Sequence, residues 1–412
     1  MFKHSSKKQS GFWGDFKEVY GIMNRRIYLD HAATTYLREE ALAAMMPYLG
    51  GIYGNPSSIH TFGFEARRAF EAARSQIAEV LGAQPGEILL TSGGTESDNL
   101  AVRGVAQANK GKGRHIITSQ IEHPAVMKTC EALAKDGYEV TYLPVDQDGI
   151  VDLDVLKDAL RDDTILVSIM AANNEIGTIE PIEEIGRIVK GNSKAYLHVD
   201  AVQAVGVLDM SVDKLKDVDL MSFSAHKFYG PAGIGGLYVR QGTRLSPILT
   251  GGSQEKGKRA GTENVAGAVG MAEALRLAVQ EREEEAARLK KLRDYLIERV
   301  LSEIPNSRLN GHRHKRLPGN VNFSFDYIEG ESLVMRMSAL GIAASTGSAC
   351  SSASLDPSHV LLAIGLKHET AHGSYRVTLG KATTRQDIDD TVEALKGVVK
   401  DLRDMSPLCQ EG

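Results

Sequence analysis

Cysteine is scarce in this sequence, and its scarcity limits what the chain can be. The 412 residues include three cysteines, Cys130, Cys350 and Cys409. Three thiols cannot all pair with one another, and their spacing matches neither a zinc site nor a disulfide framework. The pattern is typical of a protein of the reducing cytoplasm, so we expect a cytoplasmic location and no metal centre.

Long apolar runs and an excess of positive charge are also missing. No apolar run approaches the roughly 18 residues that are read as a membrane span, so none is expected. The net charge of −5 and the pI of about 6.2 provide no basic field for nucleic acid or an anionic membrane. Residues 1–26 lack the apolar segment of a secretory signal, so we interpret them as an N-terminal extension, with Met23 as an alternative start.

What is present describes a soluble α/β protein of two domains. Hydrophobic residues make up 42% and charged residues 25% of a chain too long for one ordinary core. Predicted strands at 87–91, 115–118, 139–143, 165–171 and 196–199 alternate with predicted helices at 64–81, 96–110, 124–136 and 182–190. This alternation predicts a mostly parallel sheet with helices on both faces.

The predicted domain boundary falls in a long helix near residues 266–301. We expect a large domain at 27–275 and leave open whether its first residues pack on the second domain. The remainder, 276–412, mixes short strands with helices, which is typical of a smaller α+β domain. Its last helix repeats apolar residues at helical spacing behind a Thr383 or Thr384 cap.

The most informative stretch surrounds Lys227. A short buried strand precedes Ser224, His226 and Lys227, and a glycine-rich turn follows them. Open α/β sheets bind ligands beyond the carboxyl ends of their strands, where a lysine amine can form a Schiff base with an aldehyde. An ordinary surface lysine is the alternative that this stretch alone leaves open.

Two further groups follow predicted strands in the first half of the chain. The glycine-rich loop at 91–99 opens a helix, so its amides and the Thr95 hydroxyl could bind a phosphate. His123 follows the next strand, where a neutral imidazole could stack on a ring or transfer protons. A simple capped helix and a loop histidine without a task are the corresponding alternatives.

The strand ends at Asn174 and Asp200 carry more polar groups. A carboxylate that ends an apolar strand, as Asp200 does, is costly to bury unless it meets a cation, and a protonated pyridine nitrogen would serve. Gln203 could donate to an oxygen of the same ring, and the Asn174 amide could bind a ring oxygen or a carboxylate. An N-cap aspartate and a turn are the alternatives.

The second domain offers a thiol and a guanidinium. Small polar residues surround Cys350, unlike the apolar neighbours of a buried structural cysteine, so we interpret it as a nucleophile. Arg376 suits two-point binding of a carboxylate. Arg259 and Thr262 stand in a glycine-rich loop that suits phosphate or subunit contacts.

Taken together, these stretches closely resemble the pyridoxal-phosphate cysteine desulfurases of the NifS/IscS type, which belong to the class-V aminotransferases of fold type I. The resemblance covers residues 28 to about 402. It is carried by residues 28–35, 91–99, 122–124, 173–177, 198–203, 224–227, 259–262, 347–352 and 355–360. Each match is weak alone, but the ordered set is specific. Ser253 and Ala353 depart from glycines common in the family.

The resemblance implies a role for each candidate. Lys227 would hold the cofactor as a Schiff base, Asp200 would pair with its ring nitrogen, and Gln203 would bind its ring oxygen. His123 would stack on the ring and move protons. The phosphate would be held by Thr95, Ser224 and His226, with Thr262 reaching in from the second subunit. Asn174 and Arg376 would fix the substrate carboxylate, and Cys350 would take up the sulfur of L-cysteine as a persulfide.

The resemblance also implies partners and leaves rivals open. A homodimer with shared active sites is expected, and the sulfur would pass to an iron–sulfur scaffold protein or another thiolation acceptor. A selenocysteine lyase or a small-molecule aminotransferase of the same class would not need Cys350. A scaffold that kept the fold without activity would not need Lys227, Asp200 and His123 together with Cys350.

Overall fold

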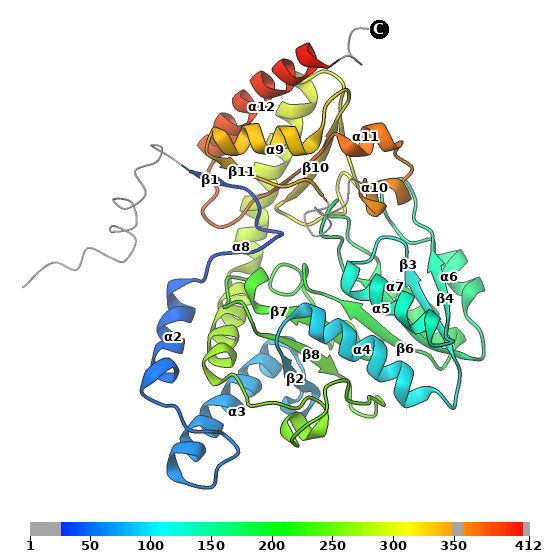
Figure 1. The fold of residues 1–412 in the computed structure, drawn as a ribbon, viewed down its shortest axis with the longest axis vertical. Coiled ribbons are helices and arrows are strands. Elements are labelled where there is room, and N and C mark those ends of the chain that lie inside the picture. Colours follow the sequence, from blue (N-terminus) through cyan, green and yellow to red (C-terminus); the bar gives the residue numbers. More distant parts are fainter. Residues whose placement is uncertain (1–25, 348–356, 407–412) are drawn as a thin grey trace, which may run out of the picture.

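The computed structural model describes residues 26–347 and 357–406, and a seven-stranded sheet forms the centre of its larger lobe (Figure 1). The strand order is β2-β8-β7-β6-β5-β3-β4, and β8 is the one strand that runs antiparallel to its neighbours. The strands are β2 (Ile88–Thr91), β3 (His115–Ser119), β4 (Glu139–Leu143), β5 (Thr164–Met170), β6 (Tyr196–Asp200), β7 (Leu220–Ser224) and β8 (Gly235–Val239). The predicted α/β fold with a mostly parallel sheet is confirmed.

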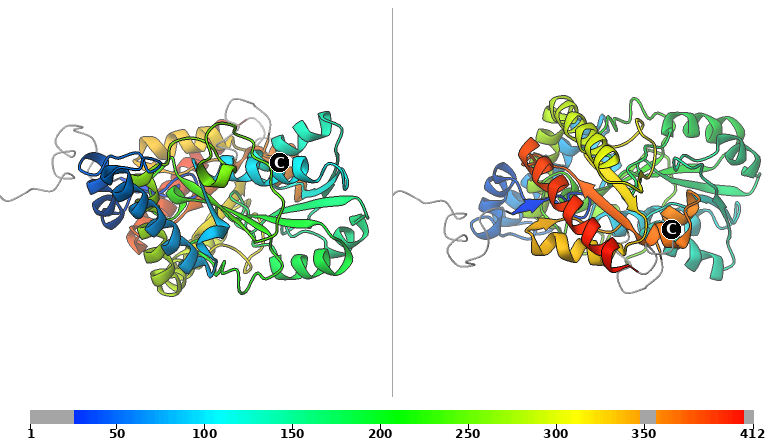
Figure 2. Two further views of the ribbon diagram at one scale, coloured as in Figure 1. Left: turned by 90° about the horizontal axis from the view of Figure 1, so that it is seen from below. Right: turned by 90° about the horizontal axis from the view of Figure 1, so that it is seen from above.

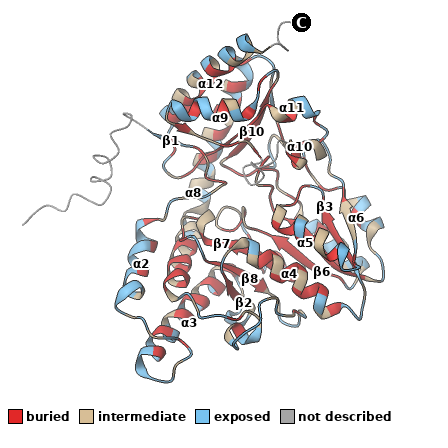
Figure 3. Ribbon diagram, in the orientation of Figure 1, coloured by how far each residue is buried: buried red, intermediate tan, exposed pale blue. Residues whose placement is uncertain are grey.

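Both faces of this sheet are buried, because helices cover each of them. Successive strand residues point to opposite faces, so each strand contributes side chains to both cores. In β5, Leu166 packs with α4 (Gly94–Asn109) and α5 (Pro124–Lys135), while Val167 packs on the other face. That second face is covered by α3 (Thr61–Leu81), α6 (Leu153–Ala159), α7 (Ile182–Asn192) and the first half of α8 (Val265–Glu303). The buried residues concentrate in the strands and on the inner sides of these helices (Figure 3).

Helix α6 is not among the predicted helices. It spans seven residues, and the Asp152 carboxylate accepts hydrogen bonds from the Asp154 and Val155 amides at its start. Two turns are too few to show a helical period in the sequence, so the capping aspartate is the one local signal that indicates this helix.

The smaller lobe is built on the second half of α8. The antiparallel sheet β12-β10-β9 consists of β9 (Ser307–Leu309), β10 (Asn320–Phe325) and β12 (Ser374–Thr378). The first strand, β1 (Ile27–Tyr28), pairs in parallel with β11 (Ile342–Ala343), and Leu29 joins the core of this lobe. Helices α9 (Gly330–Ala339) and α12 (Arg385–Met405) cover the sheet, and α12 lies beside α8 (Figure 2).

Two short helices connect the lobes beside the carboxyl edge of the large sheet. They are α10 (His359–Ala363) and α11 (His368–His372). Val360 and Leu361 of α10 pack against Ile121, Met170 and Ile176, which stand at or beyond the ends of β3 and β5. The remaining elements are α2 (Glu39–Gly50), which packs on α8, and the 3-10 turns η1 (Pro85–Glu87), η2 (Ala225–Lys227) and η3 (Gln254–Gly257). No helix in the described ranges is long and apolar enough to cross a membrane.

Candidate active site

A cavity of about 800 Å³ opens at the carboxyl edge of the large sheet. This volume falls within the range of about 300–1,000 Å³ that is usual for small-molecule sites. The cavity lies where the parallel strands end, as the topology requires. Its lining includes nine of the predicted site residues: Thr95, His123, Asn174, Asp200, Gln203, Ser224, His226, Lys227 and Arg376.

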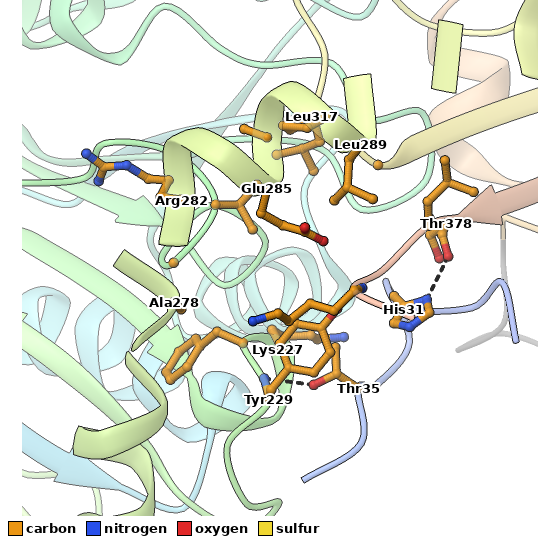
Figure 4. A pocket seen from close by; sticks show the side chains of 18 of the residues that line it. His31, Thr35, Lys227, Tyr229, Ala278, Arg282, Glu285, Leu289, Leu317 and Thr378 are labelled. Carbon is orange, nitrogen blue, oxygen red and sulfur yellow. Dashed lines mark hydrogen bonds between the residues drawn. The ribbon is translucent and has the colours of Figure 1, made fainter. Parts of the chain in front are cut away.

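Lys227 enters the cavity from η2, the single turn after β7. Its amine donates to the backbone oxygens of Ala32 and, at 2.8 Å, of Ala33, both in the loop that follows β1. Lys227 also borders a second cavity of about 110 Å³, together with Tyr229 and Glu285 of α8 (Figure 4). That space is too small for an aromatic cofactor, so the large cavity is the one that can offer a ligand to the amine.

Asp200 and His123 face the cavity from the ends of β6 and β3, which lie on either side of β5 in the sheet. Asp200 is 5% exposed, and its Oδ1 accepts a hydrogen bond from the Val202 amide at 2.9 Å. Burial raises the pKa of Asp200, although His123 and Lys227 counteract this. His123 caps α5 by accepting the Ala125 amide on Nδ1 at 3.1 Å, and burial lowers its pKa. The imidazole is therefore neutral at physiological pH, with its second nitrogen left for a ligand.

The end of the cavity near α4 is suited to a phosphate. Gly93 adopts φ +155° and ψ −176°, which a side chain would strain, and a Cβ on Gly94 would stand 2.7 Å from Val202 Cγ2. The backbone therefore comes close to the cavity, and the first-turn amides of α4 lack acceptors within the helix. The hydroxyls of Thr95 and Ser224 line the same cavity.

His226 and Gln203 make contacts with the loop after β1. His226 Nδ1 lies 3.1 Å from Thr34 Oγ1, and burial and the charge of Lys227 lower the pKa of His226 to about 4. The ring is therefore neutral and can donate one hydrogen bond. The Gln203 amide donates to the Ala32 oxygen at 3.0 Å, the same carbonyl that accepts from Lys227.

Arg376 supplies a buried guanidinium on the small-lobe side. It is 3% exposed, donates to Asp30 Oδ1 at 2.9 Å and to the Asn174 backbone oxygen at 3.0 Å. Its buried Nε has no hydrogen-bond partner among the described residues. A buried cationic donor without an acceptor marks a place where an anion such as a carboxylate would be stabilised.

Three acidic residues of this region, one half-buried and two buried, were missed as functional candidates. Asp30 follows β1 and pairs with Arg376, Asp98 lines the cavity from α4, and Glu175 lines it from the turn after β5. Each lies in or beside a stretch quoted above, and a charged residue after an apolar strand was the available signal. The group that each of these carboxyl side chains meets belongs to a part of the chain that is far away in the sequence.

Two predicted residues are not placed in this cavity. Thr262 is exposed and is not among the lining residues; its loop is connected to α4 through Arg259, which pairs with Glu96 at 2.7 Å. Cys350 lies outside the described residues. Cys130 is buried in α5, and burial raises its pKa to about 12, so it is not a nucleophile at neutral pH.

The donor set fits an aromatic aldehyde that carries a phosphate and a cationic ring nitrogen. An amine, a buried carboxyl, a neutral imidazole and a helix N-terminus meet around one space. A cation in particular would stabilise the carboxyl group of Asp200, because burying an unpaired carboxylate costs free energy. No group of three or more His, Cys, Asp or Glu side chains within residues 26–347 and 357–406 could hold a metal ion.

Comparison with known proteins matches residues 27–391 to the family model described as aminotransferase class-V. The chain is 56% identical to a cysteine desulfurase IscS of Dictyoglomus turgidum over 94% of this chain and 98% of the relative. It is 54% identical to a cysteine desulfurase IscS of Methanosarcina thermophila, over 93% and 95%. A solved structure titled NifS-like protein superposes with a TM-score of 0.87 at 41% identity, covering 92% of this chain and all of that one. The chain therefore belongs to the class-V aminotransferase family, in its group of cysteine desulfurases of the IscS/NifS type.

Proposed function

We propose that this protein is a pyridoxal-phosphate-dependent cysteine desulfurase that converts L-cysteine to L-alanine and hands the sulfur on from Cys350. The observation that carries the proposal is the meeting of Lys227, Asp200, His123 and Arg376 at one cavity, in a chain with IscS relatives over nearly its full length. These residues come from both lobes, and a scaffold without activity has no use for the set.

The residues around the cavity would divide the binding of the cofactor among them. Lys227 would hold its aldehyde carbon, Asp200 its ring nitrogen and Gln203 its ring oxygen. The phosphate would be held by Thr95, Ser224, His226 and the amides of α4, with Thr262 contributed by the second subunit. When bound, pyridoxal phosphate supplies an electron-withdrawing ring to the substrate.

Binding of the substrate would use the cation on the small-lobe side. Arg376 and Asn174 would orient the carboxylate of L-cysteine, since the unpartnered Nε of Arg376 offers a donor in that wall. His123, neutral and beside Asp200, would donate and take back the proton on Nε2, because its Nδ1 accepts the Ala125 amide.

Sulfur transfer would belong to Cys350. Its thiolate would form an S–S bond with the sulfur of the substrate while the C–S bond breaks. The electron pair of that bond would stay with the substrate carbon, which takes up a proton and leaves as L-alanine. The persulfide on Cys350 would then pass to an acceptor, such as an iron–sulfur scaffold protein or a thiolation protein. The reaction is expected in the cytoplasm.

Replacing Cys350 with alanine tests the proposal, with Cys409→Ala as the matched control. We expect Cys350→Ala to lose at least about 1,000-fold of its alanine formation from L-cysteine, as a missing nucleophile does. The absorbance of the bound cofactor should remain in both variants, and Cys409→Ala should keep its turnover. Alanine formation that persists in Cys350→Ala would favour a selenocysteine lyase or aminotransferase mechanism instead. A purified protein without the cofactor's absorbance would favour a scaffold.

A further inference from the structure

Glu175 connects two parts of the chain that lie on either side of residues 348–356. It is 5% exposed, in the turn between β5 and α7. Its Oε2 accepts a hydrogen bond from Ser358 Oγ at 2.5 Å. A Cβ added to Gly347 would stand 2.6 Å from the same oxygen. One carboxyl oxygen therefore contacts Ser358 and leaves room only for glycine at 347.

The backbone of Glu175 is itself held firmly. Its amide donates to Asn173 Oδ1 at 2.8 Å, and its carbonyl accepts from Asn322 Nδ2 of β10 at 3.3 Å. Asn173 is anchored in turn through its side-chain amide, which donates to the Ile121 carbonyl at 2.8 Å. The carboxyl thus stands at a defined place between the large sheet and the small lobe.

Ser358 uses the same hydroxyl to start α10. Its Oγ accepts the amides of Val360 and Leu361 at 3.2 and 3.3 Å while it donates to Glu175. A hydroxyl that donates and accepts at once has its orientation determined. Glu175 therefore also determines where α10 begins.

The charge of Glu175 is tied to the predicted substrate site. Burial raises its pKa to about 7, while Ser358 and the positive charge of Arg376 counteract the rise. The carboxyl lines the same cavity as Arg376, and neither residue is used in the sulfur step described above. Burying an ionisable carboxyl group costs free energy, so its presence at this junction indicates a functional role.

We propose that Glu175 is a positioning residue for sulfur transfer: through Gly347 and Ser358 it sets where the chain on either side of segment 348–356 stands relative to the Arg376 side of the cavity. The inference rests on the proposed function, because Cys350 belongs to that segment. It assigns Glu175 no contact with the reacting atoms.

The test is a double-mutant cycle on the formation of the Cys350 persulfide in a single turnover with L-cysteine. The variants are Glu175→Ala, Ser358→Ala, the double variant and the conservative Glu175→Gln, which keeps a hydrogen-bond acceptor. We expect each alanine variant to slow persulfide formation by about tenfold, and the double variant to lose clearly less than the product of the two single losses, because both variants remove the Glu175–Ser358 contact. Glu175→Gln should recover most of the rate.

A second readout separates positioning from general damage. The affinity for L-alanine, followed by the absorbance of the bound cofactor, should stay within about twofold of the wild type in every variant. Glu180→Gln, which changes an equally buried carboxyl outside the cavity, should keep the wild-type rate. If Glu175→Ala does not fold, Ser358→Ala and Glu175→Gln carry the test.

Two results would overturn the proposal. One is additive losses from Glu175→Ala and Ser358→Ala, which would mean that they act independently. The other is an equal loss of L-alanine affinity and of the rate of persulfide formation. That result would mean that Glu175 acts only by positioning Arg376 for substrate binding. A wild-type enzyme that forms no persulfide on Cys350 would instead refute the proposed function.

Discussion

Several carboxyl groups of the large lobe are buried without full hydrogen bonding. Asp98 Oδ1, Glu122 Oε2 and Glu180 Oε1 have no hydrogen-bond partner among the described residues. Burial raises the pKa of each of them, and the charge of Asp200 adds to the rise at Asp98 and Glu122. Burial raises the pKa of Asp200 as well, but His123 and Lys227 counteract the rise there, which favours Asp200 as the carboxylate that would face a bound cation.

Glu180 offers a test of this charge arrangement through stability. Burial raises its pKa to about 8, far above the value of about 4.3 for an unperturbed glutamate. Between these values the folded state holds a proton that the unfolded state has lost, so folding stability falls as the pH rises. We expect the melting temperature to decline from pH 5.5 to pH 8, and the decline to be smaller in Glu180→Gln. Calorimetry at the two pH values measures it; equal slopes in both proteins would contradict the assignment.

At the scale of elements, α8 joins the two lobes because its two halves pack into different hydrophobic cores. Its first half packs Met271 and Leu275 into the core of the large sheet, and its second half packs Leu296 and Val300 into the core of the small lobe. The helix has 39 residues, so it spans roughly 60 Å at 1.5 Å per residue. One continuous helix therefore sets the distance between the sheet edge and the Arg376 strand.

The start of α12 depends on a reciprocal cap. Thr384 Oγ1 accepts the Asp387 amide at 3.2 Å, and Asp387 Oδ2 accepts the Thr384 amide at 2.8 Å. We expect Thr384→Ala to lower the free energy of unfolding by about 1 kcal/mol, because the Asp387 amide loses its side-chain acceptor. Thr384→Ser should be close to neutral. Denaturant unfolding measures the stability of both variants. An equal loss of stability in the two would contradict a capping role for the hydroxyl group.

At the scale of the molecule, one edge exposes an unusual number of apolar side chains. Met46 and Leu49 of α2 are 57% and 59% exposed, and Ile59, Phe62 and Phe64 around the start of α3 are 100%, 50% and 58% exposed. Both helices pack on α8 in the large lobe. Large apolar side chains exposed in this number are typical of a protein interface, and the proposed homodimer would provide the partner.

The dimer can be tested with charge on this apolar edge. We expect Met46→Lys combined with Leu49→Glu to yield monomers in analytical ultracentrifugation, because buried charges oppose association. If Thr262 of a second subunit binds the phosphate, the monomer should also bind the cofactor about tenfold to 100-fold more weakly, as for a lost hydrogen bond to a charged group. Met335→Lys, at a methionine on α9 that is 73% exposed, is the control. A dimer that persists in the double variant would move the interface elsewhere.

The sequence by itself determined most strands and helices of the large domain and the order of the strand-end residues, because hydrophobic period, caps and glycines are local signals. From these the parallel edge, and with it the neighbourhood of Asp200, Ser224 and Lys227, could be predicted. Boundaries shifted by a few residues, and α6 was missed because two turns carry little period.

Only the tertiary structure decided which distant charges meet. Arg376 pairs with Asp30 across 346 residues of sequence, and Glu175 with Ser358 across 183. Nothing local to Asp30 or Glu175 distinguishes them from solvated acids. Their partners come from the fold, and burial raises the pKa of Glu175. That burial exists only once α8 and the helices after residue 356 have brought the small lobe against the edge of the large sheet.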